Sequence, residues 1–185
     1  MKKLVLSAVA TAAAFIAMPA FAQATGTVDV SGTVAARCTA VTPISGSITL
    51  GELAKADGTV DTAFSGNSGG LARSFTVRCN GANPQLSVNA RPLVNAAATN
   101  TPTGYANTVH YTATLTAGMA KGGSTSVADQ SVTAGATTGL IGDRLAVNAN
   151  NVTLAIANGQ TTNSTAILEA GTYTGNVEII IAPAA

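Results

Sequence analysis

Tyr173-Thr-Gly-Asn-Val-Glu-Ile-Ile-Ile181 is a strongly strand-forming stretch near the C-terminal end of the sequence. β-Branched residues favour strands because they pack well on a pleated surface. Successive side chains of a strand point to opposite faces, so Val177, Ile179 and Ile181 share one face and Ile180 lies on the other. The stretch predicts a strand whose Val177 face is directed into a core. It also raises the question of which strands lie beside it.

The same alternation of apolar and polar residues recurs at short intervals through the chain. Turn-forming pairs such as Asp57-Gly58 and Asn158-Gly159 stand between the alternating stretches. Many short strands with regular turns are typical of a β-sandwich or a β-barrel. We therefore predict an all-β fold with further strands over 44–50, 71–79, 85–90, 105–117 and 152–156.

Two segments of the chain carry more specific expectations. Asn80-Gly81 follows the 71–79 strand and begins a turn, which predicts a hairpin with the 85–90 strand. Residues 118–150 are rich in Gly, Ala and Thr and alternate only weakly. We expect loops there, with one or two short strands near Leu140 and Leu145.

The composition favours strands over helices and excludes two classes of partner. The chain is rich in Ala, Thr, Val, Gly and Asn and poor in Lys, Glu and aromatic residues. This composition disfavours long surface helices and suits strands joined by turns. Nucleic acids and anionic membranes bind clustered basic surfaces. The one dense basic feature is Lys2-Lys3, so we expect neither partner.

The first 22 residues have the three parts of a secretory signal peptide. Lys2 and Lys3 give the positive start, Leu4 to Met18 the apolar stretch, and Ala20-Phe21-Ala22 a cleavage site of the small-x-small type. An N-terminal membrane anchor is the alternative, but the apolar run is short and ends at this site. Cleavage after Ala22 leaves 163 of the 185 residues, the size of one domain.

Cys38 and Cys79 are the two cysteines of the sequence. An even count in an exported protein predicts a disulfide. Closing a loop of about 40 residues stabilises a fold by roughly 4 kcal/mol in the chain-entropy model. We expect no metal site and no cofactor, because the sequence has no Cys-x-x-Cys pair and its single histidine, His110, stands alone in a strand-like run.

Gly66-Asn67-Ser68-Gly69-Gly70 resembles the loop around the nucleophile of trypsin-like proteases. A nucleophilic serine needs a histidine base and a group that orients it. Here the only histidine follows Ser68, whereas in that family it precedes the serine, and Asn67 replaces an aspartate. We therefore interpret the loop as a turn and His110 as an ordinary strand residue, and we expect no enzymatic activity, a secreted hydrolase included.

Residues 168–175 resemble the tyrosine corner that leads into strand F of immunoglobulin-type sandwiches. In a complete sandwich of that type another strand, G, follows strand F. The sequence ends at Ala185, just past Pro183, and leaves no residues for strand G. We therefore expect an incomplete immunoglobulin-like β-sandwich with a groove along its core and an unpaired edge.

Gln23-Ala-Thr-Gly-Thr-Val-Asp-Val-Ser-Gly-Thr-Val34 provides a strand in excess. Val28, Val30 and Val34 lie on one face with Gly32 between them, and the polar residues lie on the other face. The excess strand of one copy is expected to fill the groove of the next. Head-to-tail exchange of this kind does not close, so it builds a fibre.

Three motifs in this order resemble the spore coat protein U family, which includes the subunits of archaic chaperone–usher pili. They are Thr25-Gly-Thr-Val-Asp-Val30 ahead of Cys38, Phe75-Thr-Val-Arg-Cys79, and Ala170-Gly-Thr-Tyr-Thr-Gly-Asn-Val-Glu-Ile-Ile-Ile181. Residues 118–150 match nothing in that pattern, and the ending Ala182-Pro-Ala-Ala185 lacks the aromatic residue that often closes such subunits.

The resemblance implies a domain organisation and a set of site residues. Residues 1–22 would be the signal peptide, 23–36 an N-terminal donor strand and 37–185 a pilin-type β-sandwich domain completed by donor-strand exchange. The implied sites are donor positions Val28, Val30, Gly32 and Val34, the family disulfide Cys38–Cys79, and a groove edge formed by Tyr173, Val177, Ile179 and Ile181.

The resemblance also implies where the protein acts and with what. It implies secretion through the periplasm to a pilus on the bacterial cell surface, with a role in adhesion and biofilm formation. The implied partners are neighbouring pilin subunits, a periplasmic chaperone that shields the groove and an outer-membrane usher, with no nucleic acid and no membrane span.

A self-contained secreted binding module, for carbohydrate or another surface ligand, is the alternative function. In such a module residues 23–34 would pair within their own sheet. The sequence has no Trp and three Tyr. This scarcity of large aromatic rings argues against a platform for stacking sugars.

Overall fold

The computed structural model describes residues 26–184. The expected signal peptide, and residues 23–25 of the expected donor strand, therefore lie outside the described residues. The chain divides into two compact units, residues 1–34 and residues 35–185.

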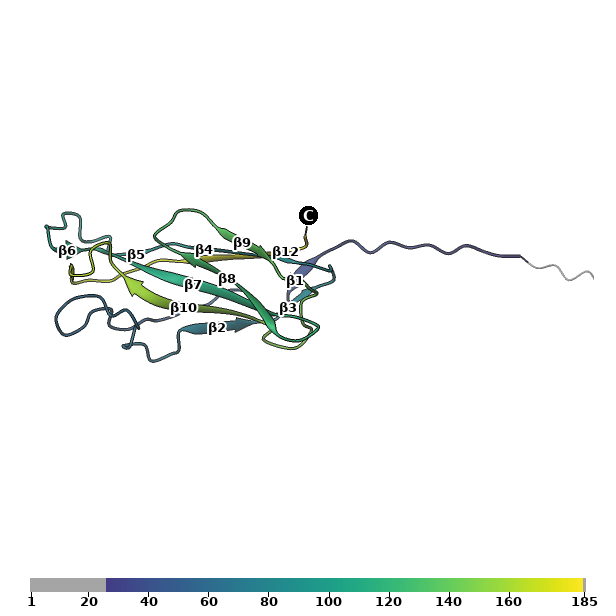
Figure 1. Cartoon of the computed structure of the whole chain (residues 1–185), viewed down its shortest axis with the longest axis horizontal. Coiled ribbons are helices and arrows are strands. Elements are labelled where there is room, and N and C mark those ends of the chain that lie inside the picture. Colours follow the sequence, from purple (N-terminus) through teal and green to yellow (C-terminus); the bar gives the residue numbers. More distant parts are fainter. Residues whose placement is uncertain (1–25, 185) are drawn as a thin grey trace, which may run out of the picture. The chain divides into compact units, whose positions relative to one another are not determined.

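The described part of the chain is all-β and contains no helix (Figure 1). None of its elements could therefore cross a membrane as a helix. The strands are β1 (Cys38–Ala40), β2 (Ala72–Phe75), β3 (Val77–Cys79), β4 (Gln85–Ala90), β5 (Leu93–Val94), β6 (Tyr105–Ala106), β7 (Thr108–Gly118), β8 (Ser124–Gln130), β9 (Thr137–Leu140), β10 (Val152–Gln160), β11 (Ile167–Leu168) and β12 (Val177–Ala182).

The larger sheet has the order β2-β10-β7-β5, with β8 paired to β7 as well. All of its pairings are antiparallel, and β10 and β7 form the longest ladder. The inward residues of β7 alternate strictly with less buried outward residues, most of them threonines, and Val109, Tyr111, Ala113 and Leu115 are all buried. This alternation is the one that the sequence predicts for residues 105–117.

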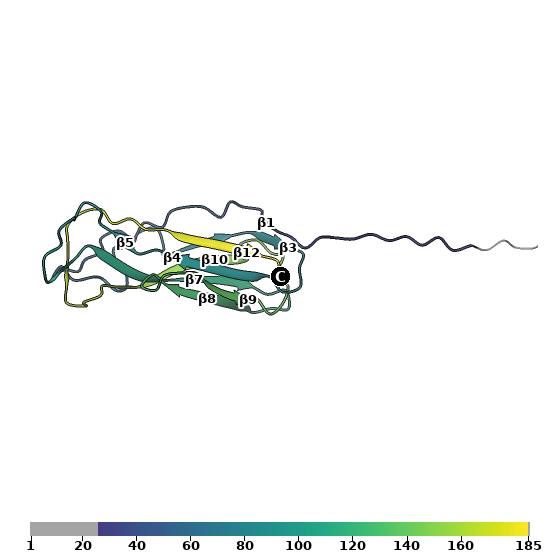
Figure 2. The ribbon, with the colours of Figure 1, turned by 90° about the horizontal axis from the view of Figure 1, so that it is seen from above.

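The second sheet has the order β12-β4-β9 and is also antiparallel. Its central strand β4 buries Leu86, Val88 and Ala90 against the larger sheet. These residues join those of β7 and β10 in one apolar core. Figures 1 and 2 show the strands of both sheets running along the same long direction of the domain.

Two small ladders complete the domain. β1 pairs antiparallel with β3, and Cys38 lies opposite Cys79. These two cysteines form the disulfide that the even cysteine count predicts. At the other end of the domain, β6 and β11 pair in parallel.

The hairpin predicted at Asn80-Gly81 is wrong. β3 pairs with β1, whereas β4 passes into the second sheet and pairs with β12 and β9. The side chain of Asn80 accepts a hydrogen bond from the backbone N–H of Arg37 and donates one to the carbonyl of Ala35. Asn80 therefore ties the connection to the segment before β1 instead of closing a tight turn between β3 and β4.

Two other predictions need correction. Residues 44–50 are not a strand, although Ile44, Ile48 and Leu50 are half-buried on one face as the alternation predicts. Residues 118–150 contain β9, which confirms the short strand expected near Leu140, and also β8, which lies where only loops were expected. β9 ends at Leu140, but Leu145 forms only an isolated bridge with Met119. The strands predicted over 71–79, 85–90 and 152–156 are confirmed, the first as β2 and β3.

Candidate functional site

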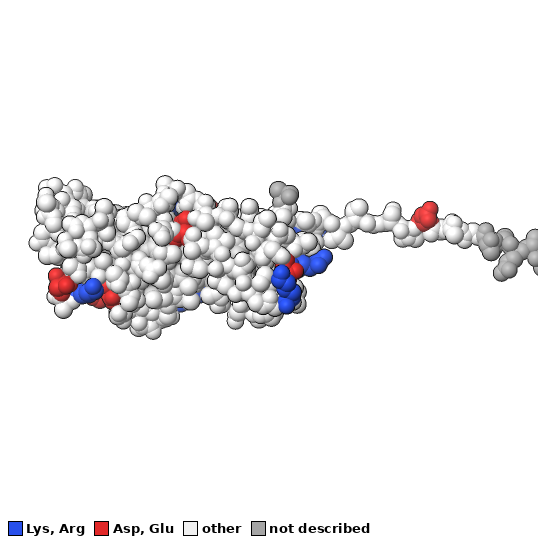
Figure 3. All heavy atoms as spheres, viewed as in Figure 1, with Lys and Arg blue, Asp and Glu red and all other residues white. Residues whose placement is uncertain are grey.

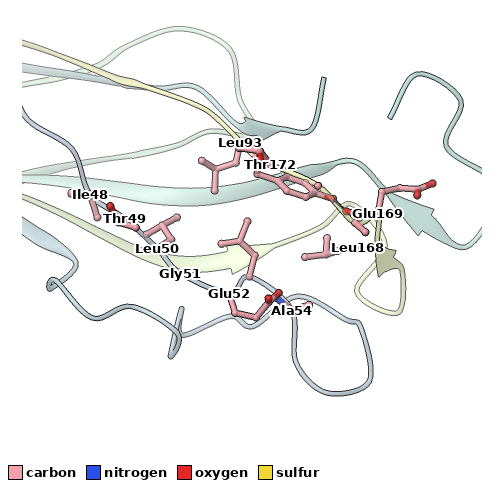
Figure 4. Close-up of a pocket in the computed structure, with 14 residues that line it drawn as sticks. Ile48, Thr49, Leu50, Gly51, Glu52, Ala54, Leu93, Leu168, Glu169 and Thr172 are labelled. Atoms are coloured by element: carbon pink, nitrogen blue, oxygen red, sulfur yellow. Dashed lines mark hydrogen bonds between the residues drawn. The ribbon is translucent and has the colours of Figure 1, made fainter. Parts of the chain in front are cut away.

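A groove lies between residues 46–54 and the segment that leads into β12. It consists of two adjoining hollows of about 690 and about 300 Å³. Ile48, Leu50 and Leu93 line both of them. Figure 4 shows Leu50, Leu93 and Leu168 converging on the larger hollow from three different segments. Apolar side chains from parts of the chain that are far apart in sequence therefore meet in the groove, and polar residues such as Glu52 and Glu169 share the lining of the larger hollow.

The floor of the smaller hollow is the face of the larger sheet. Tyr111 of β7 and Leu154 and Ile156 of β10 line it. These side chains belong to the central core, and each is less than one-tenth exposed. The groove thus reaches down to the core of the domain.

One side of the groove is an edge strand with a single partner. Within the described residues β12 pairs with β4 alone, and the bridge between Thr174 and Val94 lies on the same side as β4. The N–H and C=O groups on the other edge of β12 therefore have no partner strand. Such an edge is a template for pairing with a further strand.

The other side of the groove also has unpaired backbone. Among the described residues, no backbone–backbone hydrogen bond involves residues 43–52. The side-chain amide of Asn67 donates to the carbonyl of Thr49, which holds this segment in place. Backbone polar groups in native proteins are nearly all paired with protein or water. Within this segment the half-buried Ile48 and Leu50 alternate with the exposed Ser47 and Thr49, as the side chains of a strand do.

The inward face of β12 is incompletely covered. Val177, Ile179 and Ile181 are all half-buried, whereas their cross-strand neighbours Ala90, Val88 and Leu86 are at most 2% exposed. On the outward face Ile180 is 51% exposed. The four large apolar side chains of β12 are therefore all partly in solvent.

Tyr173 fixes the turn that carries the chain into β12. Its hydroxyl lies 2.9 Å from the carbonyl of Glu169 and 3.0 Å from that of Ala106, and can donate to either. Burial raises the pKa of Tyr173, so the hydroxyl keeps its proton and remains a donor. A hydrogen bond to the backbone a few residues upstream is the mark of a tyrosine corner.

The phenol of Tyr111 joins the floor of the groove to the same segment. It donates to the carbonyl of Asn176 at 3.2 Å. Burial raises the pKa of Tyr111 to about 12, and the negative charge of Asp129 adds to this effect. Tyr111 is therefore neutral at physiological pH and holds the start of β12 against the larger sheet.

Residues 26–34 form no strand within the described chain. Val28, Val30 and Val34 are 89%, 92% and 80% exposed. A Cβ added at Gly32 would meet no atom within 4 Å. The predicted donor positions are thus apolar side chains in solvent, an unfavourable state for three valines of one short segment.

The two residues weighed for catalysis lie in unrelated elements. Ser68 is in the loop before β2, and His110 lies in β7 opposite Gln160. No hydrogen bond joins them, and the described residues contain no group of three or more His, Cys, Asp or Glu side chains arranged to hold a metal. Sequence reasoning missed β8, where the buried Asp129 hides the strand pattern.

Comparisons with known proteins give no further information. No family model, no curated protein and no solved structure matches this chain.

Proposed function

We propose that this chain is a structural subunit of a surface pilus of the archaic chaperone–usher type. In this proposal residues 37–185 form an immunoglobulin-like sandwich that lacks one strand, and residues 23–36 of a neighbouring copy complete it. The observation that carries the proposal is the groove, because unpaired backbone lines both of its sides and the core forms its floor.

A strand in this groove would pair with β12 on one side and with residues 43–52 on the other. Each ladder hydrogen bond adds about 0.5–1.5 kcal/mol. Alternate side chains of the strand would enter the apolar lining formed by Leu50, Leu93 and Ile156. The inserted strand would also cover the inward face of β12, which is now partly in solvent.

Residues 27–34 have the pattern that such a groove requires. Val28, Val30 and Val34 would face the core, and burying three valines gives about 4.5–9 kcal/mol at about 1.5–3 kcal/mol each. Gly32 would allow the donor backbone to approach closely where the groove is tight. Thr27, Asp29, Ser31 and Thr33 would face solvent. Dissociation would expose donor and core together, so the joint would persist kinetically.

The same proposal includes the route to the surface. An exposed groove and an apolar donor segment are an aggregation hazard before assembly. The proposed partners are therefore a periplasmic chaperone that shields the groove and an outer-membrane usher at which subunits exchange donor strands. Export would use residues 1–22 as a signal peptide cleaved after Ala22.

The test is a pair of charge insertions in the mature chain. Val28→Asp with Val30→Asp places two carboxylates on the donor face, and Thr27→Asp with Ser31→Asp places two on the opposite face. We expect the first variant to abolish detergent-resistant polymers and the second to assemble like the wild type. Polymers are measured by electrophoresis without heating, and the Cys38–Cys79 disulfide is checked by mass.

Two outcomes would contradict the proposal. Detergent-resistant polymers of the Val28→Asp/Val30→Asp variant would show that the valines do not occupy the groove. A wild-type chain that stays a stable, soluble monomer without a chaperone would favour the self-contained binding module instead.

A further inference from the structure

Acidic side chains gather at one end of the domain. The acidic end consists of Glu52, Asp57, Asp61 and Glu169, with Lys55 as its only basic residue, which gives a formal net charge of −3. Two bridges, Ala54 to Val60 and Thr59 to Ile167, bring these segments together. Glu52 and Glu169 line the larger hollow of the groove (Figure 4).

Two carboxylates of the acidic end have a pKa below the ordinary value of an aspartate. The Thr59 hydroxyl and backbone N–H donate to the carboxylate of Asp57 and lower its pKa. The backbone N–H groups of Ser65 and Ala63 lower the pKa of Asp61 in the same way.

Basic side chains gather at the other end. The basic end consists of Arg37, Arg78, Lys121 and Arg144, with Asp143 as its only acidic residue, which gives a formal net charge of +3. The backbone N–H of Lys121 donates to the Asp143 carboxylate, and the Arg78 guanidinium donates to the carbonyl of Asn148 in the loop that follows. Arg37 is held beside Arg78 through Asn80.

The two ends are separated by the length of β10. Asn151, directly before β10, bonds through its side chain to the backbone of Val77 at the basic end. Near the other end of β10, the N–H of Gly159 donates to the carbonyl of Thr62 beside Asp61. Nine residues of strand span about 30 Å. Figure 3 shows charged groups at both ends and a largely uncharged surface between them.

We propose that these ends meet across the joint between two copies of this chain, the basic end of the donor against the acidic end of the acceptor. This inference rests on the proposed function, and it adds which charged groups meet at each joint. The partner is a second copy, and the argument is the charge complementarity of the two ends.

The direction of β12 determines which charged ends a parallel or an antiparallel donor strand would place side by side. β12 begins after Glu169 and ends at Ala182, opposite Gln85, near the loop that contains Asp143 and Arg144. A donor strand antiparallel to β12 therefore runs from the basic end toward the acidic end of the acceptor. It leaves the groove beside Glu52 and Glu169.

Arg37 follows Val34 by three residues, a reach of about 10 Å in extended chain. With an antiparallel donor, Arg37 and the rest of its basic end face the acceptor's Glu169. With a parallel donor, the same basic end faces Arg78 and Arg144 of the acceptor, and like charges oppose each other. An antiparallel donor therefore brings opposite charges together at every joint, whereas a parallel donor brings like charges together.

The test is a charge swap in the full mature chain. The single variants are Arg37→Glu and Glu169→Lys, because the structure shows no hydrogen bond of either side chain within the described chain. The double variant carries both changes and so restores opposite charges at every joint of a homopolymer. We expect each single variant to slow polymer growth about five- to tenfold at low salt and the double variant to recover most of the wild-type rate. Arg91→Glu, an exposed charge outside both ends, is the matched control.

Salt and neutral substitutions sharpen the same experiment. At about 0.5 M NaCl the differences between variants should disappear, because screening acts within a few ångströms. Arg37→Gln and Glu169→Gln should also slow polymer growth, but less than the charge reversals do. Thermal unfolding shows whether a reversed charge disturbs folding, and in that case these neutral variants replace the reversals.

The outcomes separate the two proposals. If the wild type forms polymers and both single variants grow at the wild-type rate, the charged joint is wrong and donor-strand assembly stands. The same holds if the double variant grows no faster than the single variants. A wild-type chain that forms no polymer would overturn both.

Discussion

β4 and β12 lie side by side in one sheet and have nearly the same apolar pattern, yet their environments differ. β4 has a partner on each edge, and its inward residues Leu86 and Val88 are fully buried. β12 has one partner, and the residues opposite them, Ile181 and Ile179, are half-buried. An inward-facing side chain is covered by the strands on both sides of its own, so an alternating pattern alone does not bury it.

The comparison extends to residues 43–52 on the far side of the groove. This segment alternates like a strand and turns Ile48 and Leu50 inward, but it has no backbone partner in the described chain. A single additional strand would pair both edges and cover both sets of side chains. β4 and β12 should therefore differ in how much their inward side chains stabilise the domain, and a strand in the groove should remove that difference.

The largest effect is expected from truncating paired residues of the two strands. Leu86→Ala should lower the free energy of unfolding by about 3 kcal/mol, because it leaves a cavity in the core. Ile181→Ala, directly opposite, should cost about 1 kcal/mol, because its side chain is already partly in solvent. Urea unfolding in the Val28→Asp/Val30→Asp background, which is expected to stay monomeric, measures both.

Ile180 provides the control on the outward face of β12. Ile180→Thr should change stability by less than about 0.5 kcal/mol, since the side chain is 51% exposed and threonine retains the β-branch. Equal losses for Leu86→Ala and Ile181→Ala would mean that β12 is as well covered as β4, and the groove would lose its significance.

A smaller effect is expected from the titration of Tyr111 beneath the start of β12. Burial raises the pKa of Tyr111 to about 12 from the ordinary 10.0. The unfolded chain loses this phenol proton before the native state does, so the stabilisation is complete below about pH 10 and is lost as the pH rises toward about 12. The loss should be about 1–2 kcal/mol.

Tyr111→Phe is the matched variant for this titration. It should weaken the alkaline loss of stability, measured by urea unfolding from pH 9 to 12, relative to the wild type. An identical pH dependence in both proteins would show that Tyr111 is not held neutral against the segment before β12.

The sequence allowed the all-β class, most strands and the inward residues of β7 to be predicted, because alternation depends only on neighbouring residues. It did not allow the partners of the strands to be predicted. The Asn80-Gly81 hairpin failed because Asn80 bonds to Arg37 and Ala35 and β4 enters the other sheet. β8 was missed because its inward Asp129 is buried, bonded to the Ala90 N–H and the Thr137 hydroxyl.

The candidate site shows the same limit. The apolar residues of β12 were identified from the sequence, but the opposite side of the groove was not. Residues 44–50 alternate like any strand, and only the structure shows that their backbone is unpaired. The charged ends were also missed, because each is assembled from segments far apart in the sequence.

Amide hydrogen exchange on a single acceptor chain reports whether a donor strand pairs with both sides of the groove. The Val28→Asp/Val30→Asp chain supplies an open groove, and a synthetic peptide of residues 23–36 supplies the donor strand. We expect the peptide to protect amides of residues 43–52 together with those on the outer edge of β12, and a peptide with both valines changed to aspartate to protect neither. Unchanged exchange in both segments at saturating peptide would contradict this expectation.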